Sequence, residues 1–394
     1  IVAQAGEILF REESPETKFI YTTDKEIAFK DKDFILCQMR TGGYPMRLKD
    51  EQIPMSLGVI GQETCGPGGF AYGMRSIRDM IELVNDVRTY SPEAWIINYT
   101  NPAAIVADAL SLVFPEDKKI LNICDQPVNL LRSYGRLMEV DEKIWEPVYF
   151  GLNHFGWFTH LYDKDGNDYV PLIKEKISKD GFIPVDAEQR DKSWLDTYGM
   201  VKDMLDDFPD YLPNTYLQYY LYPEYKYHKM DPINTRAVEV MKGREKRVFE
   251  ECAAIVAANT TKDSKLVHND AHGDMIVEVA ESIAHNRNQI FIVILKNDGL
   301  IANVSDSAMV EVAATLGKNG PRAFGVGEVS TFYKGLIENQ FAYERLTVEA
   351  YLEGSYKKAL MALTLNRTVI DAKKARKVLD ALIEANQGYW PALK

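Results

Sequence analysis

The sequence has few cysteines, an excess of negative charge and no long apolar run, and each of these features excludes a class of protein. Only four cysteines occur in 394 residues, at positions 37, 65, 124 and 252, which excludes a disulfide framework and indicates reduced thiols in a cytoplasmic protein. The formal net charge of -12 argues against a nucleic-acid partner, because such a partner needs a basic face. No run approaches the roughly 20 apolar residues of a membrane span, and no signal peptide is visible.

The start of the chain also lacks the strand and glycine-rich turn that open a dinucleotide-binding unit. Ile1 to Arg11 has the pattern of a helix already in progress, so we expect an N-terminal segment to precede it. The later glycine-rich stretch, Gly61 to Gly69, is neither a Walker A sequence nor G-x-G-x-x-G. We predict that it forms a tight irregular loop.

Strand and helix patterns alternate through residues 1–146. This alternation predicts an α/β fold with a doubly wound, Rossmann-like parallel sheet. Hydrophobic content of 46% is sufficient for a large core. The predicted strands are 19–23, 34–37, 94–98 and 119–124, and the predicted helices are 74–87 and 102–113.

From residue 147 to 394 the pattern changes to that of an α+β substrate or catalytic domain. A hairpin is predicted over 155–170, and a second one around the Asn297-Asp298-Gly299 turn. Long helices are predicted over 235–258 and 371–386. No linker of low complexity separates the two parts, so we expect a large interface between them.

The apolar stretch from Lys119 ends in Cys124 and Asp125, where ligands bind in open α/β sheets. Cys124 and His154, thirty residues later, form a candidate metal pair. Two protein ligands suit an open site completed by substrate oxygens. The alternatives are a buried structural cysteine, a core histidine and, for Asp125, a helix cap.

Other candidates carry weaker signals. Tyr216 lies in a tyrosine cluster that indicates either packing or a base with a lowered pKa. Arg47 and Arg236 are either phosphate clamps or surface charges. His268 and His272 are interpreted as a pair on a surface loop.

Taken together, these stretches resemble glycoside hydrolase family 4, and the match runs in order along nearly the whole chain. The matching segments are Arg47 with Asp50 to Pro54, Gly61 to Gly69, Asn98 to Ala104, Asn122 to Pro127, Gly151 to Trp157, Asn214 to Tyr216, Asn234 to Ala237 and Met309 to Val312. The Cys-Asp pair is similar to that of members acting on 6-phospho-α-glucosides. Gln126 departs from the family pattern, which has Met there.

The resemblance implies a lactate/malate dehydrogenase-like fold, NAD and Mn2+ as cofactors, and a phosphorylated disaccharide as substrate. It also implies a homodimer or homotetramer. The roles that it implies are metal ligands (Cys124, His154), proton donor (Asp125), base (Tyr216), a residue that increases the basicity of that base (Glu63), substrate contacts (Arg47, Asn101, Arg236) and cofactor contacts (Thr23, Asp24, Arg40).

The implied reaction is oxidation, elimination, addition and reduction, which differs from the two-carboxylate scheme of most glycosidases. NAD oxidises C3 of the sugar, Tyr216 removes the acidified C2 proton, and Asp125 protonates the leaving oxygen. Three alternatives are an NAD-dependent 2-hydroxyacid dehydrogenase of the lactate/malate type, another family 4 glycosidase, and a sugar-phosphate sensor without its cofactor unit.

Overall fold

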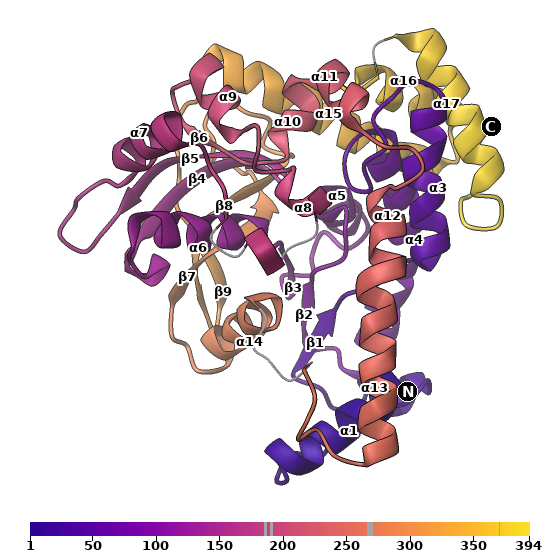
Figure 1. Ribbon diagram of the computed structural model, residues 1–394. Helices are drawn as coiled ribbons and strands as arrows, with labels where there is room; N and C mark the ends of the chain where they lie inside the picture. The colour runs from indigo at the N-terminus through magenta and orange to yellow at the C-terminus, as the bar shows by residue number, and fades with distance from the viewer. Residues whose placement is uncertain (185–186, 190–191, 266–270, 370) are drawn as a thin grey trace.

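The computed structural model describes residues 1–184, 187–189, 192–265, 271–369 and 371–394. Its elements alternate between helix and strand in the first half and become mostly helical in the second (Figure 1). The strands are β1 (Phe34–Cys37), β2 (Trp95–Asn98), β3 (Ile120–Ile123), β4 (Glu146–Leu152), β5 (Phe155–Tyr162), β6 (Leu212–Pro213), β7 (Gln289–Lys296), β8 (Met309–Gly317) and β9 (Gly320–Ala323).

The helices cover the sheets and build the C-terminal layer. They are α1 (Val2–Glu13), α2 (Lys25–Phe29), α3 (Gly43–Ser56), α4 (Gly66–Tyr90), α5 (Ala103–Val113), α6 (Gln126–Met138), η1 (Glu142–Ile144), α7 (Val170–Asp180), η2 (Ala187–Gln189), α8 (Lys192–Leu195), α9 (Val201–Asp207), α10 (Leu217–Leu221), α11 (Pro223–Lys229), α12 (Arg236–Val240), η3 (Met241–Glu245), α13 (Lys246–Ala258), α14 (Ala271–Ala284), α15 (Thr331–Glu353), α16 (Tyr356–Leu365) and α17 (Ala372–Ala385).

The main sheet has six strands in the order β1-β2-β3-β7-β8-β9. β1, β2 and β3 are parallel, as predicted, and Asn98 pairs in register with Asn122 at their carboxyl ends. β7 joins β3 antiparallel, so the hairpin predicted around Asn297 extends this sheet. The sheet therefore takes strands from both sides of residue 146.

A smaller sheet, β4-β5-β6, carries the second part of the site. Its aromatic side chains and β8 belong to one hydrophobic core, so the two sheets are packed together. The predicted hairpin over 155–170 is wrong in its pairing, because β5 pairs with β4 along seven residue pairs. The predicted turn at Asp165-Gly166 is present, with an isolated antiparallel bridge between Tyr162 and Asp168 and a bond from the Tyr169 N–H to the Leu161 carbonyl at 3.0 Å. Val170 then begins α7, which has a proline in its first turn.

Of two other expectations for the first half, one is wrong and one is confirmed only in part. Residues 19–23 form no strand, because the Phe19 ring stacks on Phe10 of α1 at 4.8 Å between centroids and the adjacent Ile20 is 54% exposed. The loop predicted over Gly61 to Gly69 is confirmed for residues 61–65 only, because Gly66 to Gly69 form the first turn of α4. The glycines there allow close backbone approach, since a Cβ at Gly68 would collide with the Gln62 carbonyl.

The helical expectations for the remaining stretches are confirmed. α12, η3 and α13 run continuously from Arg236 to Ala258, and Figure 1 shows this long helix reaching α1. Ala5 and Ile8 of α1 pack there against Cys252 and Ile255. All four cysteines are free and buried. Among the described residues, no helix has the length and apolar character needed to cross a membrane.

Glu344 of α15 is a buried carboxyl that makes the stability of the fold dependent on pH. Its Oε1 accepts a hydrogen bond from Gln340 at 2.8 Å, and burial raises its pKa from 4.5 to about 8. Folding therefore takes up a proton between these two values, and the resulting destabilisation grows as pH rises through them. One such proton changes the free energy of unfolding by about 1.4 kcal/mol per pH unit.

We expect Glu344→Gln to remove this contribution, because the amide keeps the shape without the ionisation. Urea unfolding at pH 6 and pH 8 should show that the variant loses less stability than the wild type as pH rises. Glu353→Gln, at a half-exposed position of the same helix, serves as the control. An unchanged pH dependence in Glu344→Gln would contradict the assignment.

Candidate functional site

The end of β3 presents Cys124 and Asp125 at the carboxyl edge of the parallel strands, as the sequence predicts. Asp125 precedes α6, but its side chain makes no capping bond to the helix. Instead, Asn129 Nδ2 donates to Asp125 Oδ2 at 2.5 Å. The Asp125 side chain therefore does not cap α6, although the residue occupies the N-cap position.

His154 is held in the two-residue turn between β4 and β5 with a φ of 60°, in the left-handed region. Such a φ is uncommon for a non-glycine residue and points to a functional constraint. Gly151 permits the tight hairpin, because a Cβ there would collide with the Phe155 carbonyl. His154 Nε2 lies 3.5 Å from Cys124 Sγ, so the two sheets bring the predicted pair together.

The Cys124–His154 pair fits a divalent metal ion. Bonds of about 2.3 Å to thiolate and about 2.1 Å to imidazole, at a tetrahedral angle, place the two donor atoms roughly 3.6 Å apart. Burial raises the pKa of the Cys124 thiol, and burial lowers the pKa of His154 to about 4, so the imidazole is neutral and able to coordinate. No third His, Cys, Asp or Glu completes a metal cluster within the described ranges. His268 and the His272 side chain lie outside them.

Tyr216 stacks on His154 with ring centroids 4.2 Å apart and an interplanar angle of 12°. Asn214 fixes this position, since its Oδ1 accepts from the Tyr216 backbone N–H at 3.0 Å. Burial raises the pKa of Tyr216, the Arg236 charge lowers it, and the Glu63 charge raises it further. The Tyr216 phenol is therefore protonated. It can act as a strong base only when additional positive charge approaches it and lowers its pKa.

Glu63 pairs with two arginines, and its charge reaches Tyr216. Its carboxylate lies 3.0 Å from Arg47 Nη2 and 2.7 Å from Arg40 Nη2. Burial would raise the pKa of Glu63, but the charges of Arg47, Arg40 and Arg236 outweigh burial and hold it at about 2. Glu63 is thus a permanent anion.

Glu51 connects this cluster to α12. It accepts from Arg47 Nε at 3.0 Å and from the Ala237 backbone N–H at 2.8 Å, and it is 2% exposed. The N-terminus of α12, with Arg236, is therefore anchored to α3 although the two are far apart in sequence. The predicted substrate residues Arg47 and Arg236 are brought together in this way.

The remaining predicted residues divide into two groups. Asn101 and Arg40 are near the edge of the sheet, and Asn101 Oδ1 and Arg40 Nη1 are buried without a hydrogen-bond partner in the described part of the chain. Thr23 and Asp24 lie on an exposed segment before α2, where Asp24 caps the helix by accepting from Ile27 N at 3.1 Å. No contact between described residues joins these two to the Cys124–His154 pair.

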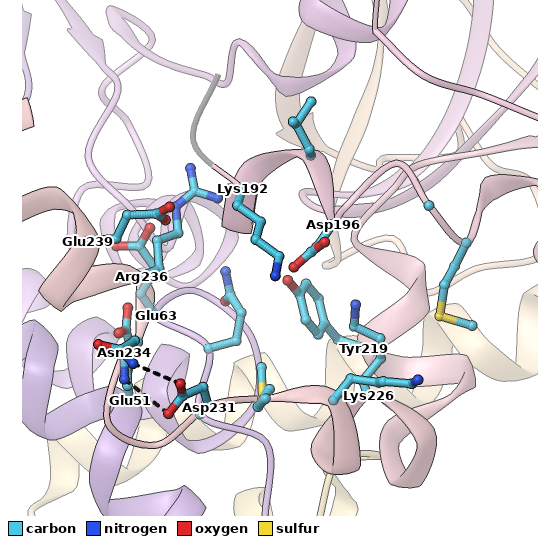
Figure 2. Close-up of a pocket in the computed structure, with 18 of the residues that line it drawn as sticks. Glu51, Glu63, Lys192, Asp196, Tyr219, Lys226, Asp231, Asn234, Arg236 and Glu239 are labelled. Atoms are coloured by element: carbon cyan, nitrogen blue, oxygen red, sulfur yellow. Dashed lines mark hydrogen bonds between the residues drawn. The ribbon is translucent and has the colours of Figure 1, made fainter. Parts of the chain in front are cut away.

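A cavity of about 1030 Å3 adjoins the site. Glu63 and Arg236 line it, whereas Cys124 and His154 do not. Figure 2 shows Arg236, Glu239 and Glu63 on one side, and Lys192, Asp196 and Tyr219 on the other. The cavity is therefore polar at both ends.

Sequence reasoning gave no role to Glu311, which is fully buried in β8. Its Oε1 accepts from Asn153 Nδ2 at 3.0 Å, so it supports the turn that carries His154. Burial raises the pKa of Glu311 to about 8. The signal in the sequence was a lone carboxylate within the apolar run from Met309 to Ala313.

Comparisons with known proteins found matches to two family models, which together span most of the chain. The model described as family 4 glycosyl hydrolase matches residues 1–139, and the family 4 glycosyl hydrolase C-terminal domain matches residues 149–369. A 6-phospho-alpha-glucosidase of Leptotrichia buccalis is 49% identical over 396 residues, which cover 100% of this chain and 90% of that protein.

Two crystal structures of 6-phospho-alpha-glucosidases from gut microorganisms are similar to this chain. One, in complex with NAD and Mn2+, is 58% identical with a TM-score of 0.98, and the match covers 100% of this chain and 89% of that one. The other, in complex with NAD and glucose-6-phosphate, is 43% identical with a TM-score of 0.95 and the same coverage.

Breaking the Glu51 connection should destabilise the fold. In Glu51→Ala, Arg47 Nε and the Ala237 N–H lose their buried acceptor, so we expect a loss of about 3–5 kcal/mol in the free energy of unfolding. Urea denaturation measures this loss. Glu26→Ala removes a pair whose side chains are both 59% exposed and should cost under about 0.5 kcal/mol. Similar small losses in both variants would refute the anchoring role.

Proposed function

Because this chain belongs to family 4 of the glycosyl hydrolases, we propose that it hydrolyses 6-phospho-α-glucosides to glucose 6-phosphate with NAD and a divalent metal ion as cofactors. The activity of the relatives and the NAD, Mn2+ and glucose-6-phosphate bound in the similar crystal structures support this function. The single observation that carries it is the Cys124–His154 pair beside Tyr216.

The same pair argues against a plain 2-hydroxyacid dehydrogenase. That chemistry needs a histidine oriented by a carboxylate and has no use for a thiolate. Here His154 Nε2 faces the Cys124 sulfur, and the ring is covered by Tyr216. The arrangement therefore suits a metal ligand better than a proton shuttle.

In the proposed reaction, Cys124 and His154 hold the metal ion. When bound, NAD and the metal supply hydride transfer at C3 and acidification of the C2 proton. Tyr216 would accept that proton as a phenolate, formed when the positive charge of the bound metal lowers its pKa, and the Glu63 anion increases the basicity of this phenolate. Asp125, held by Asn129, donates the proton to the leaving oxygen.

Substrate contacts come from Arg47, Asn101 and Arg236. Arg47 Nη2 is ion-paired with Glu63 at 3.0 Å but forms no hydrogen bond of good geometry within the described residues, so it keeps an N–H that could donate to the 6-phosphate. Asn101 Oδ1 is a buried acceptor without a donor, which suits a sugar hydroxyl better than a phosphate. Arg236 lines the cavity directly.

NAD contacts are assigned to Thr23, Asp24 and Arg40. The buried Nη1 of Arg40 suits an anionic oxygen of the cofactor. A cytoplasmic location is consistent with four free thiols and a phosphorylated substrate. The assembly expected from the family is a homodimer or homotetramer.

Removal of the metal should abolish hydrolysis, and added Mn2+ should restore it. Thiolate and imidazole with open positions bind Mn2+ weakly enough for a chelator to compete. Electron paramagnetic resonance of free Mn2+ would report binding directly. We expect Cys124→Ser and His154→Ala to lose Mn2+ binding, whereas Cys252→Ser, near α1, retains it. Full activity after chelation would disprove the metal requirement.

The role of Tyr216 as base is tested by turnover in D2O. Proton removal at C2 should incorporate deuterium into the released glucose 6-phosphate, as seen by proton NMR, without net accumulation of NADH. Tyr216→Phe should lower kcat by about 100-fold or more and keep Mn2+ binding. Tyr222→Phe, which removes a hydroxyl bonded to Asp207, is the matched control. A fully protonated C2 would exclude elimination and, with it, the proposed mechanism.

A further inference from the structure

The cavity beside the site is larger than one sugar phosphate needs. Its volume of about 1030 Å3 lies at the upper end of the range of about 300–1,000 Å3 for small-molecule pockets. Arg236 and Glu63 occupy one end of it (Figure 2). The opposite end, formed by α8, α10 and α11, has no assigned ligand.

Lys226 is the least expected residue at this second end. It lines the cavity from α11 and is only 8% exposed. Its ammonium lies 5.6 Å from the centre of the Tyr219 ring, and no hydrogen bond or salt bridge from another described residue reaches it. Burial lowers the pKa of Lys226. The ammonium of this largely buried side chain thus has an aromatic ring beside it but no hydrogen-bond acceptor among the described residues, and ligand oxygens in the cavity could supply one.

Tyr219 and Asp196 complete a mixed set of groups around Lys226. Tyr219 is 7% exposed, and its ring lies 5.9 Å from that of Tyr216, next to the proposed reacting carbons. Asp196 presents a carboxylate to the same space, facing Tyr219 (Figure 2). Donors, an acceptor and an aromatic face together match the hydroxyls and the apolar face of a sugar.

We propose that Lys226, Asp196 and Tyr219 bind the leaving sugar, which makes the enzyme selective for phosphorylated disaccharides over small alkyl 6-phospho-α-glucosides. This subsite rests on the proposed function and deepens it. A second phosphate is a poor occupant, because the Asp196 carboxylate repels a dianion. The 6-phosphate belongs to the Arg236 end.

The experiment compares two substrates with leaving groups of similar basicity, maltose 6'-phosphate and methyl 6-phospho-α-glucoside. Both leave as alkoxides that need a proton, so their ratio of kcat/KM reports contacts to the leaving sugar and not chemistry. Lys226→Met should lower the maltose-to-methyl ratio about 10- to 100-fold, the value of a hydrogen bond to a charged group. Lys226→Arg should restore part of it.

Lys246→Met is the control, since this lysine is 67% exposed, pairs with Glu250 on the surface of α13 and does not line the cavity. It should leave the ratio unchanged. Asp196→Asn, at an exposed position, should repeat the selective loss without threat to the core. These variants keep the test independent of whether Lys226→Met folds.

Inhibition by glucose 6-phosphate separates the two ends of the cavity. Weaker inhibition in Lys226→Met with an unchanged substrate ratio would assign Lys226 to the phosphorylated sugar and overturn the proposal. An unchanged ratio in both Lys226→Met and Asp196→Asn would overturn it as well. A wild-type enzyme inactive on both substrates would instead refute the proposed function, and it would refute the subsite as well.

Discussion

The site depends on charged side chains that are buried away from water and must be paired with one another. Glu63 sits between Arg40 and Arg47, and Glu51 takes the second face of Arg47 together with a backbone N–H of α12. Each buried ion is acceptable only because its partners are fixed. The result is a set of paired charges that connects α3 to α12, the helix bearing Arg236, beside the polar cavity.

Much of the architecture was predictable because it depends on local pattern. Short apolar runs ending in polar residues predicted β1, β2 and β3, and their parallel order fixes where Cys124 and Asp125 must lie. Pairing Cys124 with His154 needed more than local pattern, since it requires two sheets to meet. Their residue types made the two a candidate pair, and the family resemblance favoured this pair over a buried cysteine and a core histidine. The two donor atoms lie 3.5 Å apart.

What escaped prediction depends on contacts between distant segments. Phe19 is as apolar as a strand residue, but its ring stacks on Phe10 of α1 and does not pack in a sheet. Gly66 to Gly69 have the composition of a loop and yet begin a helix. Glycine is required there because neighbouring atoms occupy the space that a side chain would fill. Glu311 is an ordinary glutamate until β8 is placed against Asn153. In each case the outcome depends on a contact with a residue outside the short stretch of sequence from which the element was predicted.

The strand order has a consequence for how the chain is made. β3 is completed by residue 123, but its neighbour β7 begins only at residue 289. During synthesis from the N-terminus, the edge of β3 that pairs with β7 therefore stays unpaired while more than a hundred further residues emerge. An exposed strand edge invites pairing with other chains. Nascent copies of this protein are thus expected to depend on chaperones, or on early cover by the intervening helices, until β7 arrives.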